Sequence, residues 1–174
     1  FNEEFSFNKN GHVLLTFPFP VIRSNNSGIY SELLKLTENL AEYLKKQGHD
    51  IILMCHDDRD LQPAQELFPE EKFFFSNYTE DYYEIYRNAA YVIGTRLHAT
   101  ILSAGMGIPF VNINLDLRGK GFSETFKLGK WNIDVNDEKL EDKIHDRIKK
   151  IEKGDLKAFE KFYKEKEKHR KIFN

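Results

Sequence analysis

Apolar residues along this chain alternate between short continuous runs and a helical spacing. The continuous runs predict strands that are covered on both faces, as in a parallel sheet. They span residues 12–17, 50–55, 72–75, 91–93 and 110–115. Between them the apolar residues recur every three or four positions, which predicts helices over residues 29–47, 61–67, 80–88 and 97–106. Strands that alternate with helices indicate an α/β fold, a Rossmann-like parallel sheet with helices on both faces.

The last third of the chain is more polar and more helical. A helix is expected over about residues 136–153, Gly154 ends it, and a lysine-rich last helix follows. That last helix carries an apolar stripe of Phe159, Phe162 and Tyr163. We therefore divide the chain into an α/β domain, residues 1–154, and a C-terminal helix, residues 155–174.

Composition narrows the class of protein. The 174 residues suffice for one domain with its own core, and the formal net charge of -2 argues against a dedicated nucleic-acid binder. The single cysteine, Cys55, lies in an apolar run and is expected to be an inert core thiol. No apolar run is long enough for a membrane span and no signal peptide is present, so a cytoplasmic location is expected.

The turn after the strand over residues 91–93 carries the main candidate chemistry. Gly94 permits a sharp exit from the strand, and Arg96 and His98 follow at the start of a helix. The ligand crevice of a parallel sheet lies at the carboxyl ends of its strands, and a helix start favours anions. The Arg96 guanidinium suits a phosphate or a carboxylate, and an imidazole such as His98 can hold an anion or give a proton. The alternatives are an arginine that pairs with a nearby acid and a histidine that only caps the helix.

A second group of candidates follows the strand over residues 110–115. Asp116, Arg118 and Lys120 are expected at the same edge of the sheet, in a loop that Gly119 and Gly121 make mobile. A basic mobile loop beside an anion pocket can close over a ligand. The alternative for each of these residues is a solvated turn.

Two other loops yield weaker candidates. Arg23 lies in the polar loop after the first strand, on the same edge by the same rule. The triplet His56-Asp57-Asp58 follows the second strand, but its spacing matches no metal-ligand pattern, so it is interpreted as a polar loop. The turn at Gly94 is neither a dinucleotide fingerprint nor a P-loop.

An ordered set of residues around Arg96 resembles the polysaccharide pyruvyl transferase family. Members of that family carry an Arg-Leu-His-Ala core, a helix of small residues, a Gly-Val-Pro tripeptide, a short Asp-x-Lys segment and a Leu-Gly pair. The corresponding residues here are Val92-Ile93-Gly94-Thr95-Arg96-Leu97-His98-Ala99, Gly107-Ile108-Pro109-Phe110-Val111, Asp116, Lys120-Gly121-Phe122 and Lys127-Leu128-Gly129. The spacing from Asp116 to Lys120 is longer than usual, so the basic role of this segment can fall to Arg118 or to Lys120.

The resemblance implies the C-terminal half of a two-domain GT-B architecture and a transferase activity. The donor would be phosphoenolpyruvate, whose pyruvyl group would pass to a sugar of a cell-surface polysaccharide as a ketal. Arg96 and the Leu97 backbone N–H would hold the donor anion, with Asp116, Arg118, Lys120 and Arg23 as further binding residues. His98 would be the catalytic residue, which either supplies the proton that the enol carbon gains or stabilises the departing phosphate. No metal and no cofactor other than the donor substrate is expected.

The resemblance also implies an incomplete enzyme. The chain begins at Phe1 rather than at methionine, so we expect a piece of a longer protein from which an N-terminal domain is missing. The last helix would then pack toward that domain, part of its stripe would lack a partner, and the chain alone would be inactive. The alternative for the stripe is that it packs on the sheet of its own domain. The alternatives are the nucleotide-sugar-binding half of a GT-B glycosyltransferase and a non-catalytic binding domain of the same fold.

Overall fold

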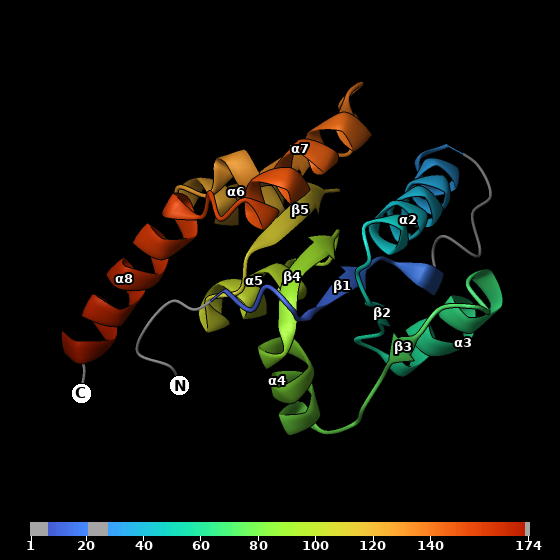
Figure 1. The fold of residues 1–174 in the computed structure, drawn as a ribbon, viewed down its shortest axis with the longest axis horizontal. Helices are drawn as coiled ribbons and strands as arrows, with labels where there is room; N and C mark the ends of the chain where they lie inside the picture. Colours follow the sequence, from blue (N-terminus) through green and yellow to red (C-terminus); the bar gives the residue numbers. More distant parts are fainter. Residues whose placement is uncertain (1–6, 21–27, 173–174) are drawn as a thin grey trace.

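The computed structural model describes residues 7–20 and 28–172, and side chains as far as residue 166 (Figure 1). Its strands are β1 (His12–Thr16), β2 (Ile51–Met54), β3 (Phe73–Phe74), β4 (Ala89–Gly94), β5 (Phe110–Asn114) and β6 (Asn132–Asp134). Its helices are α2 (Ile29–Lys46), α3 (Asp58–Leu67), α4 (Thr79–Arg87), α5 (Leu97–Met106), α6 (Leu117–Thr125), the 3₁₀ turn η1 (Gly129–Trp131), α7 (Leu140–Glu152) and α8 (Lys157–Ile172).

The described strands form one parallel sheet in the order β3-β2-β1-β4-β5-β6. The chain builds outward from β1 to β3, returns through α4, and builds outward again from β4 to β6. The order therefore reverses between β1 and β4, where parallel sheets of this kind open a crevice for ligands. The predicted fold class, an α/β Rossmann-like sheet, is confirmed.

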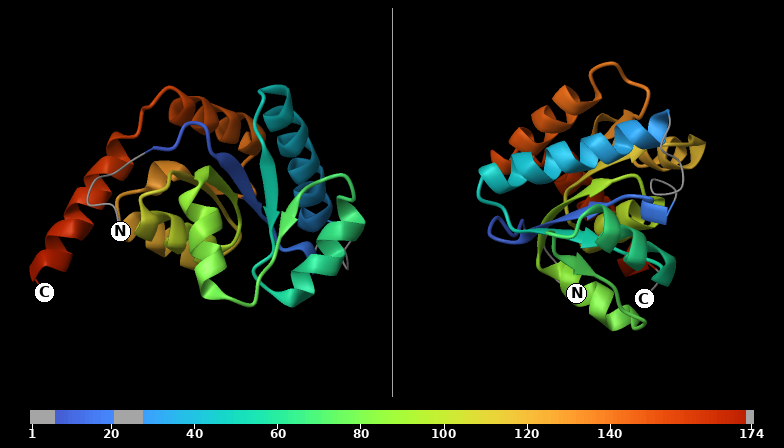
Figure 2. Two further views of the ribbon diagram at one scale, coloured as in Figure 1. Left: turned by 60° about the horizontal axis from the view of Figure 1, so that its bottom comes forward. Right: turned by 90° about the vertical axis from the view of Figure 1, so that its right-hand side faces the viewer.

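Helices cover the sheet on its two faces (Figure 2). On one face α2 and α7 lie side by side, because Asn39 donates to Glu141 and the Tyr43 ring stacks on His145 at 4.1 Å. On the other face α5 contacts both α4 and α8. The leucines that the helical spacing of α2 directs inward are buried, namely Leu33, Leu36, Leu40 and Leu44.

The central strands form the core of the domain. All six residues of β4 and all five of β5 are buried, because each strand is covered on both faces. The largest fully buried side chains include Tyr86, Tyr91, Phe17, Phe19 and Phe110. This rigid centre fixes the ends of β1, β4 and β5, which carry the candidate site.

Several boundaries differ from the sequence-based expectation. The segment after β5 is not a mobile loop but the helix α6, and β6 adds a strand that the sequence pattern did not indicate. The polar-loop prediction for His56-Asp57-Asp58 is confirmed for His56 and Asp57 and wrong for Asp58, which begins α3; Asp57 caps this helix by accepting from the Arg59 backbone N–H at 3.0 Å.

The last helix has partners in this domain. Phe159 of α8 is 3% exposed and its ring packs on Phe110 and Trp131, with centroids 5.2 and 4.6 Å apart. Tyr163 is also buried, and Phe162 packs on Phe126. The expectation that part of this stripe lacks a partner is therefore wrong, whereas a contact of α8 with a further domain stays a prediction.

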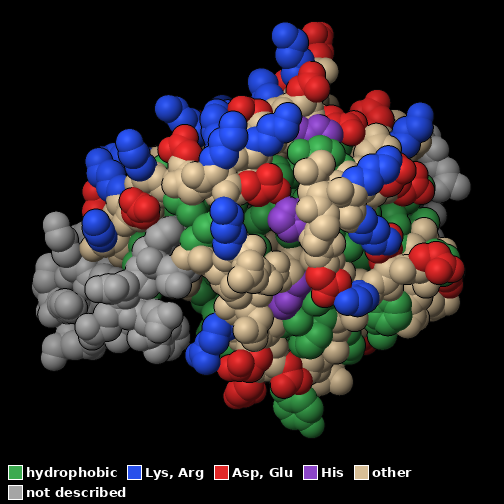
Figure 3. Space-filling model, viewed as in Figure 1, with side chains coloured by type: hydrophobic (Ala, Val, Ile, Leu, Met, Phe, Trp, Pro, Cys, Tyr) green, Lys and Arg blue, Asp and Glu red, His purple; other side chains and the backbone are tan. Residues whose placement is uncertain are grey.

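The surface carries both signs of charge. Basic and acidic side chains are interspersed over the face in Figure 3, in keeping with the small net charge. In the part of the chain that the structure describes, no helix combines the length and the apolar character needed to cross a membrane.

Candidate functional site

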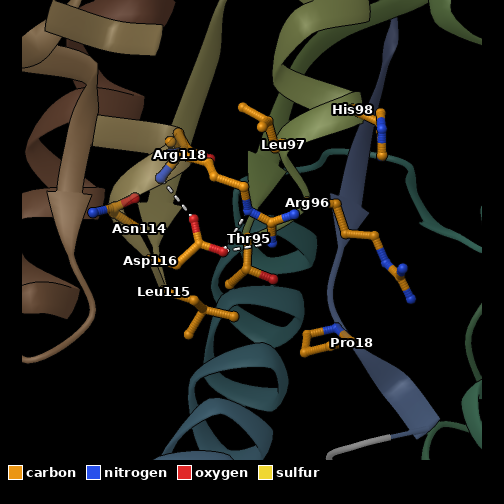
Figure 4. Close-up of a pocket in the computed structure, with 11 residues that line it drawn as sticks. Pro18, Thr95, Arg96, Leu97, His98, Asn114, Leu115, Asp116 and Arg118 are labelled. Carbon is orange, nitrogen blue, oxygen red and sulfur yellow. Dashed lines mark hydrogen bonds and ion pairs between the residues drawn. The ribbon is translucent and has the colours of Figure 1, made fainter. Parts of the chain in front are cut away.

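A cavity of about 290 Å³ opens at the carboxyl ends of β1, β4 and β5, where the strand order reverses. We call it the carboxyl-edge cavity. Figure 4 shows Arg96 and His98 on one side of it, with Asp116 and Arg118 on the other. Its lining residues are Pro18, Thr95, Arg96, Leu97, His98, Asn112, Asn114, Leu115, Asp116, Arg118 and Gly119.

The turn from β4 into α5 places the cationic side of the cavity. A Cβ at Gly94 would lie 2.0 Å from the Thr16 carbonyl oxygen, so only glycine lets β4 leave the sheet this close to β1. The Thr95 backbone N–H then donates to that same carbonyl at 2.9 Å. This pairing fixes the direction in which Arg96 leaves the sheet.

Helix α5 begins at this turn and directs its positive end at the cavity. Arg96 is the N-cap residue and no side chain caps the helix, so the first N–H groups are open to an acceptor. At the other end Gly107 ends the helix in the left-handed conformation, at φ 75°. A helix start without an anionic cap is a favourable position for a ligand anion.

The Arg96 side chain is held from behind by a buried carboxylate. Its Nη2 donates to Asp60 Oδ1, and its Nε donates to the Phe17 carbonyl oxygen at 3.4 Å. The Asp60 side chain is 0% exposed, whereas 27% of the Arg96 side chain remains exposed. The alternative weighed from the sequence, an arginine paired with an acid, is thus observed. Part of the Arg96 side chain therefore stays accessible although the residue is paired.

Asp60 is itself anchored by the start of α3. Its Oδ2 accepts from the His56 backbone N–H at 3.1 Å, and it lies in the first turn of the helix, where a negative charge is favoured. Burial raises the pKa of Asp60, and the Arg96 charge opposes that rise. Asp60 is a site residue that sequence reasoning missed. The available signal was an acid on the inward face of α3, together with Pro63 and Ala64.

A ring cluster closes the space beside Asp60. His56 Nε2 lies 2.9 Å from the Tyr86 hydroxyl, and the Tyr82 hydroxyl donates to the Cys55 carbonyl oxygen at 2.8 Å. Burial, together with the charges of Arg96 and His98, lowers the pKa of His56 to about 4. Burial raises the pKa of Cys55 to about 12, so the thiol stays protonated and unreactive. His56 is therefore neutral at physiological pH, whereas Arg96 beside it carries a permanent positive charge.

His98 lies in the first turn of α5 and is exposed, unlike the buried residues behind it. Figure 4 shows it on the same side of the cavity as Arg96, where the two side chains extend from neighbouring positions of the turn. An exposed imidazole at a cavity wall can reach a ligand and exchange protons with water.

The opposite wall is formed by the start of α6. Asp116 caps this helix by accepting from the Arg118 backbone N–H at 2.8 Å, and its side chain also pairs with the Arg118 guanidinium at 2.5 Å. That pairing lowers the pKa of Asp116. Arg118 is 76% exposed, so its guanidinium can turn from Asp116 to a ligand at small cost.

Gly119 permits α6 to lie on the end of β5. A Cβ there would lie 2.6 Å from Asn114 Oδ1 and 2.8 Å from Asn112 Nδ2. The Asn112 amide, which lines the cavity, accepts from the Thr100 hydroxyl at 3.0 Å and donates to Asn132 Oδ1. This polar floor was not predicted from the sequence. Gly119 serves close packing rather than mobility.

The remaining candidates are placed as follows. Lys120 is not among the cavity-lining residues, and its Nζ lies 3.9 Å from Glu124 on the outer side of α6. Of the two basic candidates in this segment, Arg118 therefore faces the cavity. Arg23 lies outside the described residues. Among the described residues, no group of three or more His, Cys, Asp or Glu side chains is placed to hold a metal ion.

Comparison with known proteins agrees with the resemblance predicted from the sequence. The family model of polysaccharide pyruvyl transferase matches residues 49–116 of the chain. This segment contains β2 to β5, both Asp60 and Arg96, and His98, and it ends at the cap of α6. The resemblance is thereby confirmed over that segment, whereas Arg118 and Lys120 lie beyond it. A search of curated proteins found no match.

Proposed function

We propose that the carboxyl-edge cavity binds phosphoenolpyruvate as the pyruvyl donor of a polysaccharide pyruvyl transferase. One observation carries the proposal. Arg96, the open start of α5 and His98 converge on a cavity at the reversal of strand order, within the segment that matches the family model. Arginine and free backbone N–H groups together suit a phosphate or a carboxylate, and phosphoenolpyruvate carries one of each.

The donor anion is held mainly from the β4 side. The exposed part of the Arg96 guanidinium and the Leu97 backbone N–H bind the phosphate, and the Arg118 guanidinium turns from Asp116 toward the carboxylate. Lys120, which pairs with Glu124 and does not line the cavity, and Arg23 stay further candidates for donor binding. These charges would also stabilise the phosphate as it departs, which is the usual electrostatic contribution to such a transfer.

The chemistry needs one proton at carbon and one leaving phosphate. C3 of the donor gains a proton, so that C2 becomes electrophilic. The oxygen of one sugar hydroxyl bonds to C2, and its proton restores the acid that protonated C3. The bond between C2 and the phosphate oxygen then breaks, a second hydroxyl of the same sugar bonds to C2 and closes the ketal, and the proton of that hydroxyl leaves with the phosphate. We assign the first proton to His98, because an exposed imidazole at the cavity wall can act as a general acid.

The remaining parts of the reaction lie beyond this domain. We place the acceptor sugar mainly on a further N-terminal domain, in a two-domain GT-B arrangement with the product destined for a cell-surface polysaccharide. The reaction would run in the cytoplasm on a phosphorylated metabolite. The chain alone would bind the donor without turnover, because catalysis needs both reactants oriented together.

Calorimetric titration with phosphoenolpyruvate tests the proposal. The wild-type chain should bind it, and Arg96→Ala should lower the affinity by about ten- to a hundred-fold, the usual effect of losing a charge-assisted contact. Arg87→Ala is the matched control, because it removes an exposed guanidinium that does not line the cavity. Binding of a uridine diphosphate sugar in place of phosphoenolpyruvate, or equal affinity of Arg96→Ala and wild type, would contradict the proposal.

A further inference from the structure

We infer that Asp60 is the positioning residue of this site, holding the Arg96 guanidinium so that its free edge faces the ligand anion. The inference rests on the proposed function, because it assigns Arg96 to the donor. Asp60 does not line the cavity and is fully buried behind Arg96. It would therefore act through Arg96 and not by touching the ligand.

The contacts determine which edge of the guanidinium is occupied. Nε donates to the Phe17 carbonyl oxygen, and one Nη2 hydrogen is used by Asp60 Oδ1. The hydrogens that remain are those of Nη1 and the second hydrogen of Nη2. These two nitrogens form the end of the planar fork, which is the geometry that binds two oxygens of a phosphate or carboxylate.

Asp60 can hold this orientation because its own position is fixed. Its second oxygen accepts from the His56 backbone N–H, and the backbone N–H of Asp60 donates to the Asp57 carbonyl oxygen at 2.9 Å. An arginine side chain in water loses considerable rotamer freedom when it binds a ligand. An Arg96 that is already anchored at one end has lost that freedom in the free protein, so the ligand meets a preorganised fork.

The negative charge of Asp60 could also act against anion binding, so the positioning role and a repulsive role predict opposite effects of removing it. The Asp60 carboxylate offsets the positive charge of Arg96, so its removal would raise the local positive potential. If repulsion by Asp60 dominated, Asp60→Asn would bind an anion more tightly. If positioning dominates, Asp60→Asn binds the anion more weakly. Arg96 and His56 now donate to different oxygens of Asp60, and an asparagine has a single oxygen to replace both acceptors.

The experiment measures phosphoenolpyruvate affinity in a double-mutant cycle of Asp60→Asn and Arg96→Lys. We expect Asp60→Asn to weaken phosphoenolpyruvate binding roughly ten-fold in the wild-type background. In the Arg96→Lys background it should have little further effect, because substitutions at two residues in contact are not additive. Asp58→Asn is the control, because it removes an equal charge from an exposed residue of the same helix. Tighter binding by Asp60→Asn, or the same loss in both backgrounds, would overturn the inference.

A second readout does not depend on the donor. In ¹⁵N NMR spectra at low temperature the Arg96 Nη2 hydrogens, one of which is donated to Asp60 Oδ1, should exchange slowly with water in the wild type and fast in Asp60→Asn, with Arg96→Lys identifying the signal. Equally fast exchange in the wild type and in Asp60→Asn would overturn the inference whatever the ligand. If the wild type shows the protected signal but binds no phosphoenolpyruvate, the proposed function fails and the positioning of Arg96 by Asp60 stands.

Discussion

Arg96→Ala should destabilise the fold strongly at neutral pH and much less under acidic conditions. The substitution removes the cation that faces the Asp60 carboxylate, whose side chain is 0% exposed. Breaking a buried ion pair by removing one partner typically costs about 3–5 kcal/mol, because the other charge stays buried without compensation. Although Arg96 lies at the edge of a cavity, its replacement by alanine is therefore expected to lower the stability of the fold considerably.

Protonation of Asp60 limits that loss and gives it a pH dependence. In Arg96→Ala the Asp60 carboxyl can take up a proton instead of staying charged and unpaired. Protonating a carboxyl with the ordinary pKa of 3.8 costs about 1.4 kcal/mol for each pH unit above that pKa. The loss of stability at pH 7 is therefore at most about 4 kcal/mol. At pH 5 the same limit is about 2 kcal/mol. Burial already raises the pKa of Asp60, and without Arg96 it rises further, so the folded variant binds the proton more tightly than the unfolded chain does. A carboxyl whose pKa is higher in the folded state stabilises the fold at low pH, and this contribution disappears as the pH rises through the folded-state pKa.

Urea unfolding at pH 7 and pH 5 measures this effect. We expect the difference in free energy of unfolding between wild type and Arg96→Ala to be about 3–4 kcal/mol at pH 7 and below about 2 kcal/mol at pH 5. Arg118→Ala is the matched control, since its partner Asp116 is 45% exposed and its removal should leave stability nearly unchanged at both pH values. An Arg96→Ala loss that is small, or equally large at both pH values, would refute the view that Asp60 is a buried charge dependent on Arg96.

Three further predictions follow from packing and exposure. Gly119→Ala should lower stability by about 1–3 kcal/mol in thermal denaturation, because its Cβ meets the two asparagine amides, whereas Gly121→Ala, with open space around it, should not. Phe159→Ala should cost about 3–5 kcal/mol in urea unfolding if α8 belongs to this domain, and a loss below about 1 kcal/mol would contradict that packing. His98→Gln should keep stability within about 0.5 kcal/mol of wild type, because His98 is exposed, while calorimetry should show weaker phosphoenolpyruvate binding; unchanged affinity would remove His98 from the donor site.

The sequence predicted the parts of this structure that rest on local pattern. The run from Tyr91 to Ile113 has a strand, a glycine turn, a small-residue helix and a second strand, and each is present where the pattern placed it. The meeting of Arg96, His98 and Arg118 at one edge followed from the rule for parallel strands, and they do line one cavity.

The parts that were missed depend on long-range contacts or on packing that overrides propensity. Gly119 and Gly121 disfavour a helix, yet α6 forms because Asp116 caps it and it packs on the end of β5. The pairing of Asp60 with Arg96 joins residues 36 positions apart, which no periodicity reveals. β6 is three residues long with polar ends, too short to give an alternating pattern.

The most direct test of the central claim is a crystal structure of this chain with phosphoenolpyruvate. We predict density for the donor in the carboxyl-edge cavity, with its phosphate on the end of the Arg96 guanidinium and the Leu97 backbone N–H, and with His98 beside it. Donor density elsewhere on the domain, or an empty cavity in a crystal grown with saturating phosphoenolpyruvate, would contradict the account.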